Sequence, residues 1–270
     1  MSSTIRLGTI DGIPVRLHIS FILLAVIWVA LDLFNQSFEA AISSSILVVL
    51  IFGSVFLHEL GHAWAARAFK IKTLDIVLSF FGGMARLERS PRTPLAEGAI
   101  AFAGPAVNIA LAAVCYSVEW LFFGDDLSAP TLSVTRLVHN LAIANLALAI
   151  FNLLPGYPLD GGLIARSLLS LKLARRKARL IVARSGQVFA VILGFFGLAV
   201  SPMSLPIAVF LFSSARDEIN AARGPRRSRR QPAYAPPPQY RLGEDVPVES
   251  TAAPRTGLRA RLGLPRKARM

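Results

Sequence analysis

The sequence predicts an all-α polytopic membrane protein, and its composition carries this prediction. Mean hydropathy is +0.54 and 54% of the 270 residues are hydrophobic, more than an ordinary soluble domain contains. Basic residues outnumber acidic ones by 29 to 16, and long apolar segments separate the basic residues into groups. The single cysteine, Cys115, excludes an internal disulfide framework and a Cys-x-x-Cys zinc site.

Four segments are long and apolar enough to cross the roughly 30 Å of hydrocarbon in a bilayer, which takes about 20 residues. Two shorter apolar runs follow, and Pro202 and Pro206 lie between or within them. We therefore expect about six transmembrane helices, of which the last two form a hairpin that crosses or re-enters the membrane. The segments are 18–34, 43–66, 97–123, 137–154, 186–200 and 203–215.

The basic residues indicate the orientation of these segments. All 29 except Arg136 lie in the stretches 1–17, 67–95, 155–185 and 215–270, which alternate with stretches that contain none. Positive residues remain on the cytoplasmic side of a membrane. We therefore expect both termini in the cytoplasm of a multi-pass integral membrane protein.

Three regions follow from this pattern: a cytoplasmic N-terminal segment (1–17), a membrane core (18–215) and a basic tail (216–270). The tail is rich in proline and arginine and poor in apolar residues, so we expect most of it to be disordered. A basic segment beside a bilayer can bind anionic lipid headgroups. Nucleic acid is not expected as a partner, because membrane topology accounts for the positive charge.

The motif His-Glu-Leu-Gly-His at 58–62 indicates a metal site. One helical turn separates His58 from His62, so both imidazoles can bind one metal ion. Glu59 lies about 100° around the helix, where it can hold a metal-bound water without being a ligand. Zinc lowers the pKa of such a water to about 7, and a carboxylate can accept its proton. Polar side chains in an apolar membrane segment cost free energy and are rare there unless they have a function. A chance occurrence of the motif is therefore disfavoured.

A catalytic zinc site usually has three protein ligands, so a third is required. Asp160 follows the inner end of the fourth span, at the depth of the two histidines, whereas His139 would be about 20 Å away at its outer end. For His18 a solvated position at the membrane surface is the simpler explanation, and for Cys115 a place in the core. These considerations favour Asp160.

Three motifs occur in order along the chain: HELGH at 58–62, AGPAVN at 103–108 and NLLPGYPLDGG at 152–162. With them the sequence resembles the site-2 protease family of intramembrane zinc metalloproteases (peptidase family M50), over about residues 10–215. The resemblance implies one Zn²⁺ per chain, a single-pass membrane protein as substrate, and cleavage near the cytoplasmic face in regulated intramembrane proteolysis. It also implies the plasma membrane of a prokaryote as the location.

The resemblance further implies roles for particular residues. His58, His62 and Asp160 would bind zinc, and Glu59 would activate water. Two asparagines of the family motifs fall on Asn108 and Asn152, and either amide could donate a hydrogen bond to the developing oxyanion. The alternative for both is to pack polar groups between helices, the role that we assign to Asn145.

The apolar segment 74–90 is rich in strand-forming residues and is interrupted at Gly82-Gly83. We expect a membrane-associated β-hairpin whose edge lies near the zinc and can hold the substrate as an added strand. The alternative is an amphipathic surface hairpin without a role in substrate binding.

Two other function classes remain open. A catalytically inactive membrane scaffold or chaperone is disfavoured because Glu59 and all three candidate ligands are present. An ion transporter would be expected to show inverted repeats, and the sequence shows none.

Overall fold

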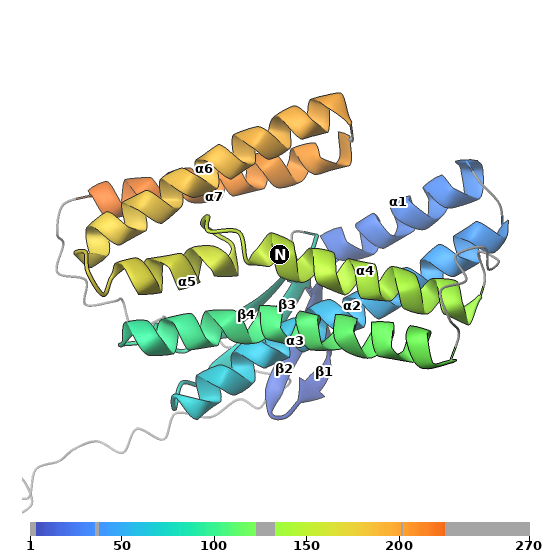
Figure 1. The fold of residues 1–270 in the computed structure, drawn as a ribbon, viewed down its shortest axis with the longest axis horizontal. Coiled ribbons are helices and arrows are strands. Elements are labelled where there is room, and N and C mark those ends of the chain that lie inside the picture. The colour runs from blue at the N-terminus through green and yellow to red at the C-terminus, as the bar shows by residue number, and fades with distance from the viewer. Residues whose placement is uncertain (1–3, 36–37, 81, 123–132, 201, 225–270) are drawn as a thin grey trace, which may run out of the picture. The chain divides into compact units, whose positions relative to one another are not determined.

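The computed structural model describes residues 4–35, 38–80, 82–122, 133–200 and 202–224 (Figure 1). The helices in these ranges are α1 (Ile19–Asn35), α2 (Phe38–Ala68), α3 (Pro94–Phe122), α4 (Val134–Asn152), α5 (Asp160–Leu169), α6 (Arg175–Ala199) and α7 (Leu205–Arg223), with the short 3₁₀ helix η1 (Pro202–Ser204) before α7. The strands are β1 (Thr4–Ile10), β2 (Ile13–His18), β3 (Thr73–Ser79) and β4 (Gly82–Leu87).

Four of the described helices are long and apolar enough to cross a membrane: α2, α3, α4 and α6. The apolar part of α1 is shorter and covers Ile19–Leu31. In α7 the charged residues Arg216, Asp217 and Glu218 interrupt the apolar run, so only its first half is apolar. The four candidate spans overlap four of the predicted segments, and each begins before its segment does, α6 by eleven residues. The two further predicted spans are not established by length and composition.

The strands form one sheet in the order β1-β2-β3-β4. The outer pairs are antiparallel, and β2 runs parallel to β3 although α1 and α2 lie between them in the sequence. The hairpin predicted within 74–90 is confirmed as β3 and β4.

The prediction of an all-α fold with one small hairpin is wrong in one respect, because the N-terminal segment adds a second hairpin. Asp11 and Gly12 form its turn with φ angles of 52° and 78°, in the left-handed region. Asp-Gly between alternating apolar residues is a strong sequence signal for such a turn. The predicted cytoplasmic segment 1–17 therefore contains a local signal for this hairpin.

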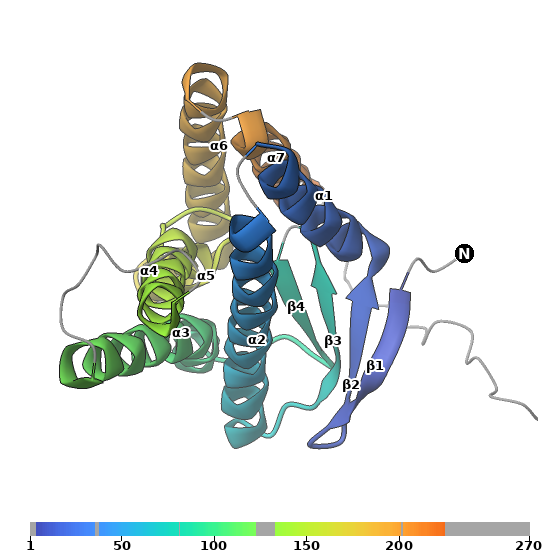
Figure 2. The same ribbon diagram turned by 90° about the vertical axis from the view of Figure 1, so that its right-hand side faces the viewer.

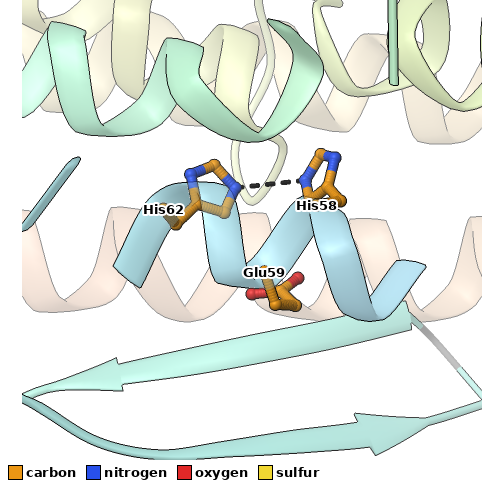
Figure 3. A group of neighbouring side chains, drawn as sticks. All are labelled: His58, Glu59 and His62. Atoms are coloured by element: carbon orange, nitrogen blue, oxygen red, sulfur yellow. Dashed lines mark hydrogen bonds between the residues drawn. The ribbon is translucent and has the colours of Figure 1, made fainter. Parts of the chain in front are cut away.

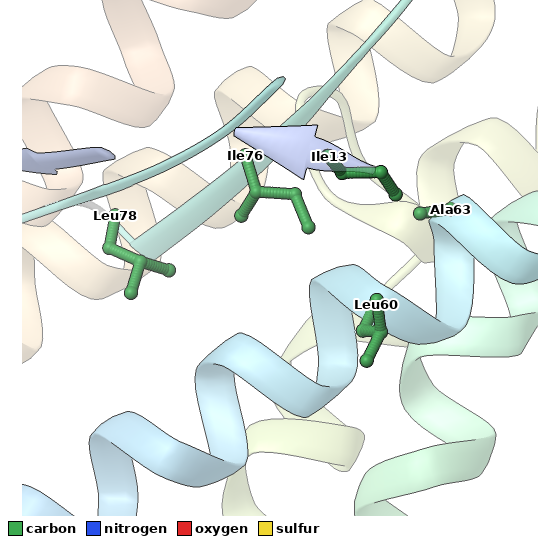
Figure 4. Packing of buried hydrophobic residues seen from close by; sticks show 5 residues of the cluster. All are labelled: Ile13, Leu60, Ala63, Ile76 and Leu78. Atoms are coloured by element: carbon green, nitrogen blue, oxygen red, sulfur yellow. The ribbon is translucent and has the colours of Figure 1, made fainter. Parts of the chain in front are cut away.

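Helix α2 lies between the sheet and the α3–α5 helices (Figure 2). On its sheet side, Leu60 and Ala63 pack against Ile13, Ile76 and Leu78, and all five side chains are buried (Figure 4). These contacts pack the sheet closely against α2.

On its other side, α2 packs against α3 at close range. A Cβ atom added at Gly61 would lie 2.8 Å from Val107 Cγ2 and 2.9 Å from the carbonyl oxygen of Ala103. Only glycine permits this approach, as expected for the small residue inside the HELGH motif.

The C-terminal helices α6 and α7 form a hairpin, and α5 contacts both α3 and α6. Helix α7 continues through residues 216–223, which form the start of the predicted tail. The rest of the predicted tail, residues 225–270, lies outside the described part of the chain.

Candidate metal centre

The three predicted ligands come together although Asp160 is about one hundred residues from the histidines in sequence. His58 Nε2 lies 3.1 Å from His62 Nε2. Asp160 Oδ2 lies 3.1 Å from His58 Nε2 and 3.4 Å from His62 Nε2. The side chains are largely buried, with exposed fractions of 7%, 12% and 16% for His58, His62 and Asp160.

The donor set fits a zinc ion. Two ligands bound at about 2.0–2.1 Å to a tetrahedral zinc lie roughly 3.3 Å apart, close to the separations observed here. A Cβ atom added at Gly104 of α3 would lie 2.6 Å from His58 Nε2 and closer still to His62 Nε2. The glycine of the AGPAVN motif thus keeps open the space into which the ring nitrogens point.

The second nitrogen of each imidazole is also held. His62 Nδ1 lies 2.7 Å from the carbonyl oxygen of Ile100, an atom that can only accept, so this nitrogen donates. His58 Nδ1 is hydrogen-bonded to Asn108 Oδ1. Such partners on the far side of the ring set the tautomer and direct the Nε2 lone pair at a metal.

Glu59 points away from the imidazoles. The two histidines face α3, whereas the Glu59 carboxylate faces the strands (Figure 3). Its Oε2 accepts the backbone N–H of Ala85 in β4 at 2.7 Å. A carboxylate oxygen still lies within 4.8 Å of a ring nitrogen of each histidine. A Cβ at Gly83 would overlap the Glu59 side chain, so β4 reaches the site only because that residue is glycine.

Asp160 is the first residue of α5 and is positioned by a closely packed loop. An added Cβ at Gly161 would overlap the carbonyl oxygen of Leu153, and one at Gly186 of α6 would overlap that of Tyr157. The Tyr157 N–H donates to the carbonyl oxygen of Val182 in α6 at 3.2 Å. The loop is thus held against α6 at backbone distance.

Electrostatics favour a charged carboxylate at this position. Burial acts to raise the pKa of Asp160, but the adjacent imidazoles of His58 and His62 outweigh it and hold that pKa below its usual range. An anionic oxygen is the form that a zinc ligand requires.

A group of charged side chains connects α5 to neighbouring helices. Arg166 of α5 pairs with Glu97 of α3, and its Nη1 lies 3.6 Å from Glu218 Oε1 of α7. Arg179 of α6 donates to the same oxygen of Glu218 at 2.6 Å. Burial and the Glu218 carboxylate raise the pKa of the nearby Tyr157 phenol. Sequence reasoning missed this group, because its members are spread over four helices.

The two candidate asparagines, Asn108 and Asn152, differ in their hydrogen bonds. Asn108 is fully buried and donates from Nδ2 to Asn145 Oδ1 at 2.8 Å, in addition to its bond with His58. These contacts favour the packing alternative for Asn108 and add a role in orienting His58. Asn152 is the last residue of α4, and within the described ranges its side chain makes no hydrogen bond.

The rejected candidate ligands are occupied elsewhere. His18 Nδ1 lies 2.7 Å from Ser20 Oγ, and His139 Nδ1 lies 2.8 Å from Glu119 Oε1. Cys115 is a free, partly exposed cysteine. Among the described residues none of the three joins the His58–Glu59–His62 group.

A buried His-Glu-x-x-His helix with a converging carboxylate, in a chain with four candidate membrane spans, defines the class of integral membrane proteins with a metallopeptidase-type centre. Comparison with known proteins agrees. The sequence model of a family described as Peptidase family M50 matches residues 46–128 and 127–193. The chain belongs to this family, that of the site-2 proteases.

Individual relatives show the same likeness. A zinc metalloprotease of Methanocaldococcus jannaschii is 36% identical over 219 residues, which cover 81% of this chain and 61% of the relative. Stage IV sporulation protein FB of Bacillus subtilis is 32% identical over 169 residues, 61% of this chain and 55% of the relative. The chain thus matches somewhat over half the length of these two proteins.

A solved structure shares the fold. The site-2 protease from Methanocaldococcus jannaschii superposes with a TM-score of 0.62 at 35% sequence identity. The match covers 80% of this chain and 95% of that one.

Proposed function

We propose that this chain is an intramembrane zinc metallopeptidase that hydrolyses a peptide bond of a single-pass membrane protein. The observation that carries the proposal is the convergence of His58 Nε2, His62 Nε2 and Asp160 Oδ2 within 3.4 Å, with the Glu59 carboxylate beside them. Family membership and the names of the relatives support the same chemistry.

His58, His62 and Asp160 would hold the metal. Bound zinc would act as a Lewis acid and make its coordinated water acidic. Glu59 would accept the proton of that water and pass it to the leaving amine, because its carboxylate is adjacent to the ligand nitrogens without being engaged by them. A buried carboxylate with one backbone donor has free oxygen lone pairs for this transfer.

The substrate would bind as an extended strand beside β4. Among the described strands β4 pairs with β3 alone, and its Ala85 N–H donates to Glu59. A segment added at this edge would bring its backbone next to the metal centre, since a helical peptide bond must unwind before attack. The unengaged amide of Asn152 is our candidate donor to the oxyanion, whereas Asn108 would act by orienting His58.

The proposed setting is the plasma membrane of a prokaryote, with both termini cytoplasmic and cleavage near the cytoplasmic face in regulated intramembrane proteolysis. The distribution of basic residues supports this orientation. A reporter fused after Arg223 should be cytoplasmic, and one inserted between residues 126 and 128 should be outside. Both reporters on the same side would contradict the orientation.

The decisive test separates the base from the ligands. Glu59→Gln should keep the bound zinc and lose cleavage of a membrane-spanning substrate by at least about 10²–10⁴-fold, because an amide cannot take the proton. Glu39→Gln, an exposed change in the first turn of the same helix, is the matched control and should cleave at the parent rate. Cleavage is followed by gel in detergent or liposomes, and zinc by mass spectrometry.

The ligand assignment is tested in the same preparations. Asp160→Ala, His58→Ala and His62→Ala should each lose most of the single zinc per chain. Full zinc in Asp160→Ala would refute its assignment, and parent-like cleavage by Glu59→Gln would refute the mechanism.

A further inference from the structure

A chain of polar side chains leads from the metal centre into the interface of α2, α3 and α4. His58 Nδ1 meets Asn108 Oδ1, and Asn108 Nδ2 donates to Asn145 Oδ1 at 2.8 Å. Asn145 Nδ2 in turn donates to Ser54 Oγ at 3.0 Å and to the carbonyl oxygen of Leu141 at 2.9 Å. The two asparagines come from α3 and α4, and Ser54 lies one turn before His58 on α2.

These groups are deeply buried, so each of their polar atoms needs a hydrogen-bond partner within the protein. Asn108 and Asn145 have no exposed surface, and Ser54 is 5% exposed. A buried amide without partners costs about 1–3 kcal/mol for each group left unsatisfied. Leucine at either position would pack between the helices without this cost. The two asparagines therefore have a role beyond packing.

The direction of each hydrogen bond follows from the partners at the end of this network that is farthest from His58. The carbonyl oxygen of Leu141 can only accept, and the Ser54 hydroxyl donates its proton to the carbonyl oxygen of Leu50 at 3.2 Å. Asn145 must therefore present its NH₂ group to both, and its oxygen to Asn108.

The same argument applies to the amide of Asn108. Asn108 must present NH₂ to the Asn145 oxygen, which leaves its own oxygen facing His58. An amide oxygen only accepts, so the ring proton of His58 is placed on Nδ1 and Nε2 is left with its lone pair. Two backbone carbonyls of α2 and α4 thus determine which nitrogen of His58 is free.

We propose that Asn145 is a positioning residue of the metal centre, which acts through Asn108 to keep the Nε2 lone pair of His58 directed at the metal. The inference rests on the proposed function in that it takes His58 to be a zinc ligand. His62 needs no such arrangement, because the carbonyl oxygen of Ile100 holds its Nδ1 directly.

Zinc affinity provides the first test. Asn145→Leu and Asn108→Leu should each weaken zinc binding by about 10–100-fold in chelator competition, the range for removal of groups that orient a ligand. Ser54→Ala should have a smaller effect, because the Leu141 carbonyl still orients Asn145. Ser45→Ala is the matched control: Ser45 also donates to a carbonyl of α2, that of Ala41, but lies outside this group.

The double variant tests whether Asn145 acts through Asn108. If it does, Asn108→Leu with Asn145→Leu should bind zinc no more weakly than Asn108→Leu alone. Additive losses, or parent affinity in Asn145→Leu, would overturn the proposal.

A second readout does not depend on zinc or on activity. The sequence has four histidines, so ¹⁵N-histidine NMR of the zinc-free protein can assign the protonated nitrogen of each. His58 should be protonated on Nδ1 in the parent and lose this preference in Asn145→Leu, while His62 stays unchanged and reports an intact fold. An unchanged His58 would overturn the proposal. A parent protein that binds no zinc would instead overturn the proposed function, and the NMR result would still decide on Asn145.

Discussion

The two sides of the metal centre are supported in different ways. The histidines lie one turn apart on the long helix α2, and their outer nitrogens contact α3 directly. Asp160 begins the ten-residue helix α5 and depends on a loop packed against α6 at glycine positions. The geometry between the histidines is therefore local, whereas the position of the third ligand depends on packing among the C-terminal helices. Changes in the C-terminal helices should therefore act through Asp160.

The largest effect is expected where an added atom enters the space between the ligands themselves. Gly104→Ala places a Cβ within 2.6 Å of His58 Nε2, so zinc affinity should fall by more than about 100-fold. Gly53→Ala, on α2 in open space, is the control and should bind zinc like the parent. Zinc content by mass spectrometry checks both, and a full complement of zinc in Gly104→Ala would show that α3 yields at this point.

A remote change on the aspartate side should come next. Gly186→Ala on α6 overlaps the carbonyl oxygen of Tyr157, so it should displace the loop and Asp160 and weaken zinc binding by about 10–100-fold. Gly194→Ala on the same helix meets only the Cβ of Ala208 at 3.8 Å and should have no effect. Equal zinc affinity in the two variants, measured by chelator competition, would mean that α6 does not position the third ligand.

The smallest effect is expected from the charged group around α5. Glu218→Gln removes pairs with Arg166 and Arg179, whose side chains are 26% and 35% exposed, so the loss of stability should be about 1 kcal/mol. Zinc affinity should then fall by at most about fivefold. Asp217→Asn, an exposed change of the same charge on the adjacent residue, is the control. A thermal shift no larger than that of the control would indicate that glycine packing alone holds α5.

What could be predicted from the sequence follows the same division. One helical turn contains His58, Glu59 and His62, so their spacing can be recognised in the sequence. Asp160 could be placed because it follows the inner end of the fourth predicted span. Ser54 and the Arg166 group could not, because their partners depend on how separate helices are rotated against one another. The pairing of β2 with β3 joins segments separated by two helices, and no local pattern encodes it.

The parallel pairing of β2 with β3 also constrains how many times the chain crosses the membrane between these two strands. One sheet occupies one side of the bilayer, so the chain must cross an even number of times between β2 and β3. The helices that the structure describes in that interval are α1 and α2. When α2 crosses, α1 has to cross as well, although its 17 residues are near the lower limit for a span. The N-terminal hairpin and the strands beside Glu59 then face the same compartment, a conclusion that uses no information from charge.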